Sequence, residues 1–343
     1  MTKNPINILE IINLNVEFPI FGGIIQREVS CVHAVKDFNL KVREGETIAV
    51  VGESGSGKST LGKAIINVLK LTAPDVRVNG DIILNPQTDD AINVLHIKPS
   101  QVKSYRSDVQ MIFQDPYSSL NPRMLVGDII IEPLDINTSS STVEKQDRVA
   151  WLLNKVGLNK EQANRYPHEF SGGQRQRIAI ARALATNPKV VIADEPVSAL
   201  DVSIQAQVIN LMMDLQDEFN LSLIFIAHDL SVVEHISNRI GVMYLGSMAE
   251  IGCSDDVYRN PKHPYTRSLL SAVPQPDPTF RNKQQRVVLK GDIPSPMAKP
   301  TGCGFRTRCP IARDKCSDDI PQLIEIAENH LVACPFYQEK FIQ

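Results

Sequence analysis

Three short apolar runs predict buried strands. They are TIAVVG (47–52), KVVIAD (189–194) and SLIFIAHD (222–229). Their apolar residues are continuous rather than alternating, which is typical of strands that are covered on both faces. The pattern therefore predicts an α/β layer fold.

Helix-like stretches lie between these runs. STLGKAIINVL (59–69) follows the first strand and is predicted to form one helix. The polar segment from about 115 to 170, which includes STVEKQDRVAWLLNKVG (141–157), predicts a helical insert outside the sheet. From about residue 255, prolines interrupt the periodicity, and we expect the segment 274–300 to be a linker or an irregular connection.

Composition restricts the class of protein. The chain has 343 residues, 43% of them hydrophobic and 22% charged, with a formal net charge of −3. These values favour a globular chain with a large core, built as two units or as one large domain with an appendage. The near-neutral charge disfavours a general nucleic-acid coat. No uncharged apolar run approaches the roughly 18 residues that a membrane-spanning helix needs, and the start MTKNPINILE lacks a signal-peptide core, so we expect a cytosolic chain.

The segment GESGSGKS (52–59) fits the pattern G-x-x-x-x-G-K-[ST] of a phosphate-binding loop. Its glycines allow consecutive N–H groups to converge on phosphate oxygens, and the helix that follows directs its positive end at the same anion. The alternative is a glycine-rich turn that binds nothing, but the predicted strand before it and helix after it favour the phosphate site. The candidate residues of this phosphate site, which the resemblance given below assigns to ATP, are Gly52, Glu53, Ser54, Gly55, Ser56, Gly57, Lys58, Ser59 and Thr60.

Two adjacent acids, Asp194 and Glu195, come directly after the apolar residues VVIA of the second run. Asp194, at the tip of a buried strand, is suited to hold Mg²⁺, and Glu195 is then placed to polarise an attacking water. The alternative is an acid pair that only caps the turn before Pro196.

Further motifs give the chain a specific resemblance. The run FSGGQRQRIAIARAL resembles the signature of the ATP-binding-cassette (ABC) ATPases, with Phe170 where Leu is usual. Gln114 resembles the Q-loop glutamine, SALD (198–201) the D-loop, and His228 the switch histidine, and all stand in the family's order. The resemblance covers the chain from about residue 8 to residue 343.

The resemblance implies a fold and a division of the chain. It implies an ABC nucleotide-binding domain over 8–260, with a mixed sheet core and a helical subdomain at about 115–180. A small irregular extension over 261–343 would carry a four-cysteine site.

The resemblance also implies roles for individual residues. Lys58 and the loop backbone would hold the phosphates of ATP, while Ser59, Gln114 and Asp194 would serve Mg²⁺. Glu195 would be the general base and His228 would contact the γ-phosphate. In the family, the signature of one subunit covers the nucleotide bound by the phosphate loop of another, and the residues expected there are Ser171, Gly172, Gly173, Gln174 and, in the D-loop, Ser198 and Asp201.

An aromatic residue is expected to stack on adenine. Phe18 lies where the family places that residue, but Phe21 is nearby and could equally be the stacker. Phe18 could also be an ordinary residue at the end of a core strand.

Other segments narrow the resemblance to one branch. DPYSSLNPRM (115–124) and HPYTRSLLSAVPQPDP (263–278) resemble the ATPase subunits of oligopeptide and dipeptide permeases, more the second than the first of the two paralogues that such systems usually carry. The branch also includes nickel importers. It implies a paralogous ATPase partner, two transmembrane permease subunits, an extracytoplasmic peptide-binding protein acting indirectly, no nucleic acid, and a peripheral place on the cytoplasmic face of the inner membrane.

Four of the six cysteines lie within the last 41 residues, with the spacing C-x5-C-x6-C-x17-C. Four thiolates can bind zinc or an iron–sulfur cluster, and the spacing alone does not select the metal. The resemblance favours a [4Fe–4S] cluster, with zinc and no metal as the alternatives. The candidate ligands are Cys303, Cys309, Cys316 and Cys334.

The alternative from a different class is a soluble ABC ATPase that acts on nucleic acid or ribosomes. Members that repair DNA carry long coiled coils between the motifs, and the intervals on either side of Gln114 are too short for them. Members that act on ribosomes have two cassettes in one chain, whereas this chain has one.

Overall fold

The computed structural model describes residues 6–23, 26–272, 289 and 291–339. The chain divides into two compact units. The first contains Met1–Glu10, Lys41–Thr47 and Ile82–Ile226, and the second contains Ile11–Leu40, Ile48–Asp81 and Ala227–Gln343. The predicted boundary between residues 260 and 261 is drawn from the family resemblance, whereas these units are defined by their internal contacts. That boundary therefore stays a prediction.

A parallel sheet forms the centre of the first unit. Strand β7 (Val190–Asp194) lies between β6 (Val109–Ile112) and β8 (Ser222–Ala227), and Asp194 pairs with Ile226 in register. Every residue of β7 and β8 is buried, which confirms the strands predicted from the two continuous apolar runs.

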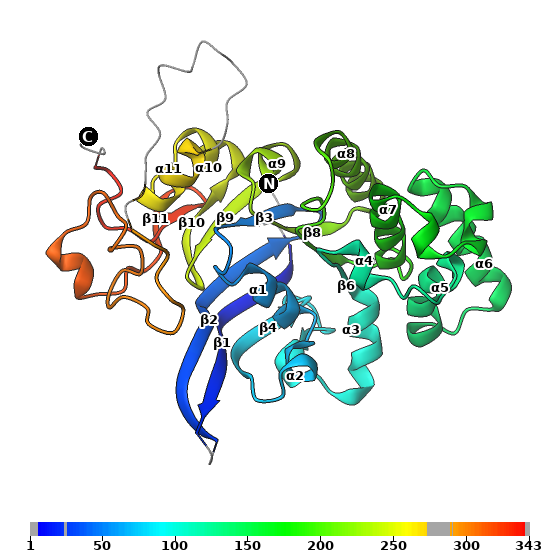
Figure 1. Ribbon diagram of the computed structural model, residues 1–343, viewed down its shortest axis with the longest axis horizontal. Helices are drawn as coiled ribbons and strands as arrows, with labels where there is room; N and C mark the ends of the chain where they lie inside the picture. The colour runs from blue at the N-terminus through cyan, green and yellow to red at the C-terminus, as the bar shows by residue number, and fades with distance from the viewer. Residues whose placement is uncertain (1–5, 24–25, 273–288, 290, 340–343) are drawn as a thin grey trace, which may run out of the picture. The chain divides into compact units, whose positions relative to one another are not determined.

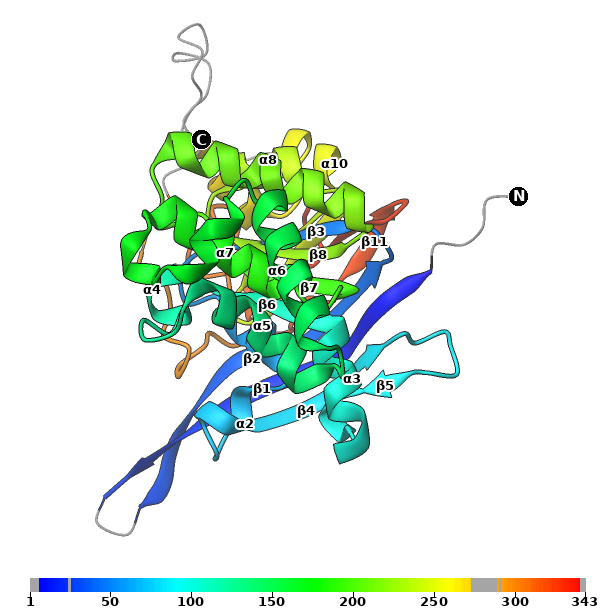
Figure 2. The same cartoon turned by 90° about the vertical axis from the view of Figure 1, so that its right-hand side faces the viewer.

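The predicted helical insert is also confirmed. Helices α5, α6 and α7 pack on one another, and α7 also contacts β6 (Figure 2). Helix α6 begins with a capping box, in which Ser141 Oγ accepts from the Glu144 N–H and the Glu144 carboxylate accepts from the Ser141 N–H. The helices of this unit are α3 (Val102–Asp108), α4 (Pro116–Ser119), α5 (Val126–Asn137), α6 (Thr142–Lys155), α7 (Gly172–Ala183) and α8 (Val202–Phe219) among the described residues. The unit also contains the short strand β5 (Ile92–Asn93) and 3-10 turns at Val94–His96, Pro99–Gln101, Lys160–Asn164 and Pro167–Glu169.

The second unit contains a sheet with both parallel and antiparallel pairs (Figure 1). Strand β3 (Thr47–Val51) runs parallel to β9 (Arg239–Tyr244), and β9 is antiparallel to β10 (Ser247–Cys253). The C-terminal strands β12 (His330–Val332) and β11 (Ile324–Ala327) extend this order, since β12 pairs with β10. Strands β11 and β12 are thereby part of the same sheet as the strand that leads into the phosphate loop.

The helix predicted over 59–69 is shorter than expected. Helix α1 spans Lys58–Ile65, and a separate turn, α2, spans Leu69–Thr72. Asn67 has a φ of 54°, in the left-handed region, and its N–H bonds back to the Ala64 carbonyl. The apolar pattern continues through this point although the backbone does not, because Asn tolerates the left-handed conformation at a helix end.

Three long strands contribute residues to both units, namely β1 (Asn7–Gly22), β2 (Arg27–Arg43) and β4 (Arg77–Leu84). The second unit also contains α9 (Leu230–Ile236), α10 (Ser254–Arg259), α11 (Pro264–Ser271) and a 3-10 turn at Asp314–Ser317. Most of the connection predicted over 274–300 lies outside the described residues. Within the described part of the chain, no helix combines the length and apolarity that crossing a bilayer requires.

Candidate functional site

The glycine-rich loop connects β3 to α1, as the motif predicts. Gly57 is the N-cap residue of α1 and has a φ of 102°. A Cβ at Gly57 would lie 2.2 Å from the Ala34 carbonyl oxygen, so both the backbone conformation and the available space require glycine. Ser59 and Thr60 lie in the first turn of the helix.

Lys58 is buried, and its ammonium group points back into the loop. Its Nζ donates to the carbonyl oxygens of Gly52, at 2.8 Å, and Glu53, at 3.1 Å. The Ser56 Oγ lies 3.5 Å from the same nitrogen. The loop therefore concentrates a buried positive charge together with a helix N-terminus, which is an arrangement suited to a phosphate group.

The C-terminal part of the chain holds the same loop. The Glu53 N–H donates to the Tyr265 hydroxyl at 2.8 Å, and the Arg308 guanidinium forms two hydrogen bonds to the Glu53 carboxylate, at 2.7 and 2.9 Å. The sequence predicted neither residue for this site. Tyr265 belongs to the HPYTR run, which marked the branch of the family, but no local pattern indicates that it reaches a loop 212 residues away.

In the first unit, the predicted catalytic carboxylate lies directly beyond β7. Asp194 is buried at the end of the strand, and Glu195 follows with a φ of 45°. The Gln114 Nε2 donates to Glu195 Oε2 at 2.8 Å, and Ser198 Oγ donates to the Glu195 carbonyl oxygen at 3.0 Å. The predicted Q-loop, second acid motif and D-loop therefore meet at Glu195. A left-handed conformation at a glutamate is uncommon, and such conformations concentrate at functional positions.

The predicted signature forms the N-terminus of α7. Ser171 is the N-cap residue: its Oγ accepts from the Gln174 N–H, and Gln174 Oε1 accepts from the Ser171 N–H at 3.0 Å. Gly172 and Gly173 occupy the first turn, and a Cβ at Gly173 would lie 2.6 Å from Ile204 Cγ2. Glycine is therefore required at Gly173 by close packing on α8, while the helix N-terminus presents N–H groups that can bind an anion.

The remaining predicted residues lie beside or within single strands and helices. His228 is exposed just beyond β8, and Asp201 is the exposed N-cap residue of α8. Phe18 is half-buried in β1 and Phe21 is 44% exposed on the same strand, so the stacking residue stays a choice between them.

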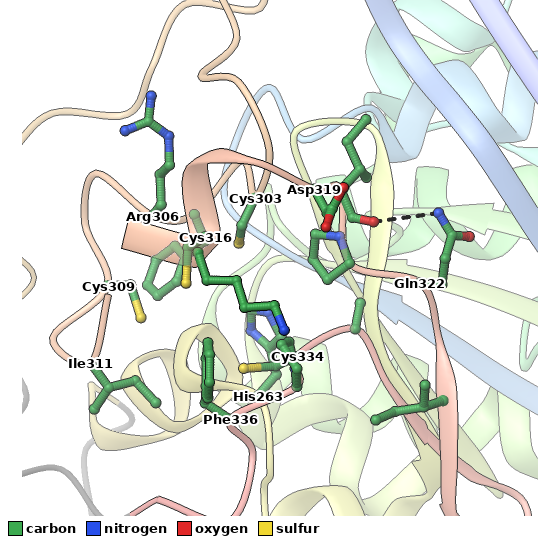
Figure 3. A pocket seen from close by; sticks show the side chains of 17 residues that line it. His263, Cys303, Arg306, Cys309, Ile311, Cys316, Asp319, Gln322, Cys334 and Phe336 are labelled. Atoms are coloured by element: carbon green, nitrogen blue, oxygen red, sulfur yellow. Dashed lines mark hydrogen bonds between the residues drawn. The ribbon is translucent and has the colours of Figure 1, made fainter. Parts of the chain in front are cut away.

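The four C-terminal cysteines line one cavity of about 280 Å³, and Figure 3 shows their sulfur atoms turned toward its interior. The Cys303 N–H donates to the Cys316 carbonyl at 2.8 Å, which joins the two loops that carry these thiols. Burial raises the pKa of Cys309 to about 12 and that of Cys334 to about 11, and it raises the pKa of Cys303 as well. Without a bound cation, these thiols would therefore stay neutral near neutral pH.

Among the described residues, however, no group of three or more His, Cys, Asp or Glu side chains is arranged so that it could hold a metal ion. The predicted cluster is therefore not shown by the structure, although the four cysteines share a cavity.

Comparisons with known proteins agree with this geometry. Residues 35–198 match the family described as ABC transporter, and residues 249–316 match the family described as oligopeptide/dipeptide transporter, C-terminal region. The chain is 50% identical to the oligopeptide transport ATP-binding protein AppF of Bacillus subtilis, over 97% of this chain and 98% of that protein. It is 52% identical to OppF of Escherichia coli, over 95% of each chain.

A solved structure shares the fold. The dimeric, post-hydrolysis structure of the ATP-binding cassette MJ0796, bound to ADP and phosphate, aligns with a TM-score of 0.58 and 27% identity, over 72% of this chain and 98% of that one. The fold and site thus define an ABC ATPase cassette. The chain belongs to the ABC transporter ATPases that carry the oligopeptide/dipeptide transporter C-terminal region.

Proposed function

We propose that this chain hydrolyses ATP to power the import of dipeptides or oligopeptides through a membrane ABC permease. The observation that carries the proposal is the identity of 50–52% with oligopeptide transport ATP-binding proteins over nearly the whole length of each chain. Its place would be peripheral, on the cytoplasmic face of the inner membrane, where it would bind two permease subunits. An extracytoplasmic peptide-binding protein would select the cargo.

The residues of the site have defined roles in this proposal. Lys58 and the N–H groups of residues 52–60 bind the phosphates, and His228 contacts the γ-phosphate. Glu195 accepts a proton from the attacking water, and Gln114, whose amide bonds Glu195, orients that carboxylate. Because the transition state of phosphoryl transfer is loose, positioning and charge supply most of the catalysis.

Magnesium would accompany the nucleotide in this proposal. Ser59, Gln114 and Asp194 would serve it, since they carry a hydroxyl, an amide and a carboxylate oxygen, and oxygen is the ligand atom that Mg²⁺ prefers. When bound, the ion neutralises phosphate charge.

Two cassettes are required for turnover in this proposal. The N-terminus of α7, with Ser171 and the two glycines, would cover the nucleotide bound by the phosphate loop of a partner cassette. The dimeric form of MJ0796 supports such an assembly. We propose a paralogous ATPase subunit as the partner, because permeases of this branch usually carry two different cassettes.

The experiment that tests the function uses the assembled transporter. The chain is purified with its co-expressed permease subunits and partner cassette in lipid, and the ATPase rate is measured with the cognate binding protein across a panel of dipeptides, longer peptides and nickel complexes. We expect stimulation by peptides. Stimulation by nickel complexes alone, or by nucleic acid or ribosomes in place of the panel, would contradict peptide import.

We further propose a [4Fe–4S] cluster in the cysteine cavity. Four half-buried cysteines around one space offer the kind of donor that such a cluster uses, and a bound cation would stabilise thiolates that burial otherwise disfavours. Bound there, the group would join loops of the extension that contain little regular structure.

Anaerobic purification tests this proposal. A broad visible absorption band and about four iron atoms per chain are expected for such a cluster. Substitution Cys309→Ser should remove both, whereas Cys253→Ser, at an exposed cysteine outside the cavity, should change neither. One zinc per chain without visible absorption would select zinc instead, and the absence of metal would exclude both.

A further inference from the structure

The contact between Arg308 and Glu53 joins the C-terminal extension to the phosphate loop. The Arg308 side chain is only 8% exposed and that of Glu53 is 23% exposed. Both terminal nitrogens of the guanidinium donate, Nη1 to Oε2 at 2.7 Å and Nη2 to Oε1 at 2.9 Å. Such a bidentate pair fixes the orientation of both side chains as well as their separation.

A second contact holds the backbone of the same residue. The Tyr265 hydroxyl accepts from the Glu53 N–H, and its ring packs against those of Tyr244, at 4.6 Å between centroids, and Phe305, at 5.4 Å. The Tyr244 hydroxyl lies 3.5 Å from Arg308 Nη1. The Glu53 main chain is therefore held by Tyr265 and its side chain by Arg308. Both of these holding residues contact one aromatic cluster, formed by Tyr244, Tyr265 and Phe305.

A third contact acts on the next turn of the loop. The Gly246 N–H donates to the Ser56 carbonyl at 2.9 Å, and the preceding Leu245 carbonyl accepts from Lys299 Nζ at 2.5 Å. Lys299 lies in the C-terminal extension. The extension is thus connected with the phosphate loop both at Glu53 and, through Leu245 and Gly246, at Ser56.

The negative charge of Glu53 makes its pairing with Arg308 important for nucleotide binding. A carboxylate inside a loop that binds a polyanion repels the ligand, and a phosphate loop binds more tightly if its N–H groups already converge before the ligand arrives. Pairing with Arg308 cancels that charge and restrains the loop.

We propose that Arg308 is a positioning residue of the nucleotide site, which neutralises Glu53 and holds the phosphate loop in the conformation that binds ATP. In this arrangement the C-terminal extension sets the ATP affinity of the cassette without touching the nucleotide.

Titration of the full-length chain with MgATP and MgADP tests the proposal. Substitution Arg308→Met should raise the dissociation constant for MgATP about tenfold, since it leaves the Glu53 carboxylate without its partner. The rise should be smaller for MgADP, which carries less negative charge. Arg308→Lys keeps the charge but cannot form the bidentate pair, so its dissociation constant for MgATP should lie between those of Arg308→Met and the unaltered chain.

The double variant Glu53→Gln/Arg308→Met separates charge compensation from simple damage to the fold. It should recover to within about threefold of the original affinity, because the repelling carboxylate is gone. Arg306→Met is the matched control: Arg306 lies in the same loop but bonds Thr301, and its substitution should leave both dissociation constants unchanged.

In the assembled ATPase, Arg308→Met should raise KM for ATP and leave kcat within about twofold, which is the pattern of a changed binding step. An unchanged dissociation constant in Arg308→Met with an unchanged melting temperature would overturn the proposal. So would an affinity loss that the double variant does not recover, or an equal loss for MgATP and MgADP.

Discussion

At the scale of single residues, Glu195 connects motifs that the sequence placed far apart. Its carboxylate accepts from Gln114, which lies 81 residues upstream, while its carbonyl oxygen accepts from Ser198. The motifs could be recognised because each has a fixed local spacing. That the motifs meet at one carboxylate could not be predicted from their spacing, because the meeting depends on the parallel register of β6 and β7.

We expect Glu195→Gln to bind MgATP normally and to lower the ATPase rate of the assembled complex at least about a hundredfold, since a general base contributes roughly that much or more. The substitution keeps the shape of the side chain and removes the proton acceptor. Steady-state hydrolysis and nucleotide binding, measured on the same preparation, check this. Glu161→Gln, at an exposed turn of the same unit, serves as the control, and normal turnover in Glu195→Gln would exclude Glu195 as the base.

The role of Arg308 could not be predicted from the sequence. The sequence assigned the C-terminal loops to a cysteine site, and the resemblance drew attention to the thiols. The partner of Arg308 lies 255 residues away, and an arginine followed by Cys309 carries no local signal of which carboxylate it will pair with.

At the scale of elements, the structure explains why His-Pro-Tyr precedes α11. His263 Nδ1 accepts from the Tyr265 N–H, Pro264 occupies the first helical position, and Tyr265 extends to the phosphate loop. The buried Glu250 of β10 accepts from the N–H groups of Lys262 and His263, at 2.8 Å each. The start of α11 is therefore anchored to the sheet as well as capped.

Glu250→Ala should destabilise the fold by about 3 kcal/mol, because it leaves these buried donors without an acceptor. Nε2 of the buried His330 lies 2.8 Å from the same carboxylate and would lose its partner too. Equilibrium denaturation measures the change. Glu250→Gln, which keeps one acceptor, should cost less, and Glu328→Ala at an exposed turn should cost almost nothing. Equal stability of Glu250→Ala and the unaltered chain would show that water replaces the carboxylate.

Stability should also fall in weak acid through His263. Burial lowers its pKa to about 4 from the ordinary value of 6.5, with Glu250 opposing and Arg267 adding to the shift. Between these two values the unfolded chain binds a proton that the folded chain does not, so the stabilising contribution is complete above pH 6.5 and declines as the pH falls toward 4.

Thermal unfolding between pH 7 and pH 5 measures this slope. The variant His263→Asn, which can still cap the helix but does not titrate, should flatten the slope. An identical slope in both proteins would assign the acid sensitivity to other groups.

The sequence predicts buried strands more accurately than it predicts helix ends or long-range strand pairing. Continuous apolar runs specify buried strands directly, and β3, β7 and β8 all lie where the runs predicted. The helix after the phosphate loop ended early because a single asparagine changes the backbone without changing the apolar pattern. The pairing of β12 with β10 had no local signal, since it joins short strands about 80 residues apart.

At the scale of the whole molecule, the two features that we propose to bind anions belong to different units. The phosphate loop belongs to the second unit, and the N-terminus of α7 belongs to the first. In the proposed dimer, each feature serves a different nucleotide. The sequence could suggest this division only through the family, because each feature alone is simply a helix N-terminus with glycines.

Substitutions at Ser171 separate the two features. Ser171→Asp can still cap α7 but adds a negative charge where a partner's nucleotide would bind, whereas Ser171→Asn caps without charge. We expect Ser171→Asp to leave the MgATP affinity of the isolated chain within about twofold and to lower the ATPase rate of the assembled complex at least about tenfold. Ser171→Asn should retain most of the rate.

Titration of the isolated chain and hydrolysis by the complex, measured for both variants, distinguish the possibilities. If Ser171→Asp weakened nucleotide binding to the isolated chain, the N-terminus of α7 would serve the chain's own phosphate loop. If instead the complex hydrolysed ATP at the full rate with Ser171→Asp, a negative charge at this helix would not reach any nucleotide, and the two-cassette arrangement would be wrong for this transporter. The proposal requires the remaining result, in which the charge is harmless to one chain and harmful to the pair.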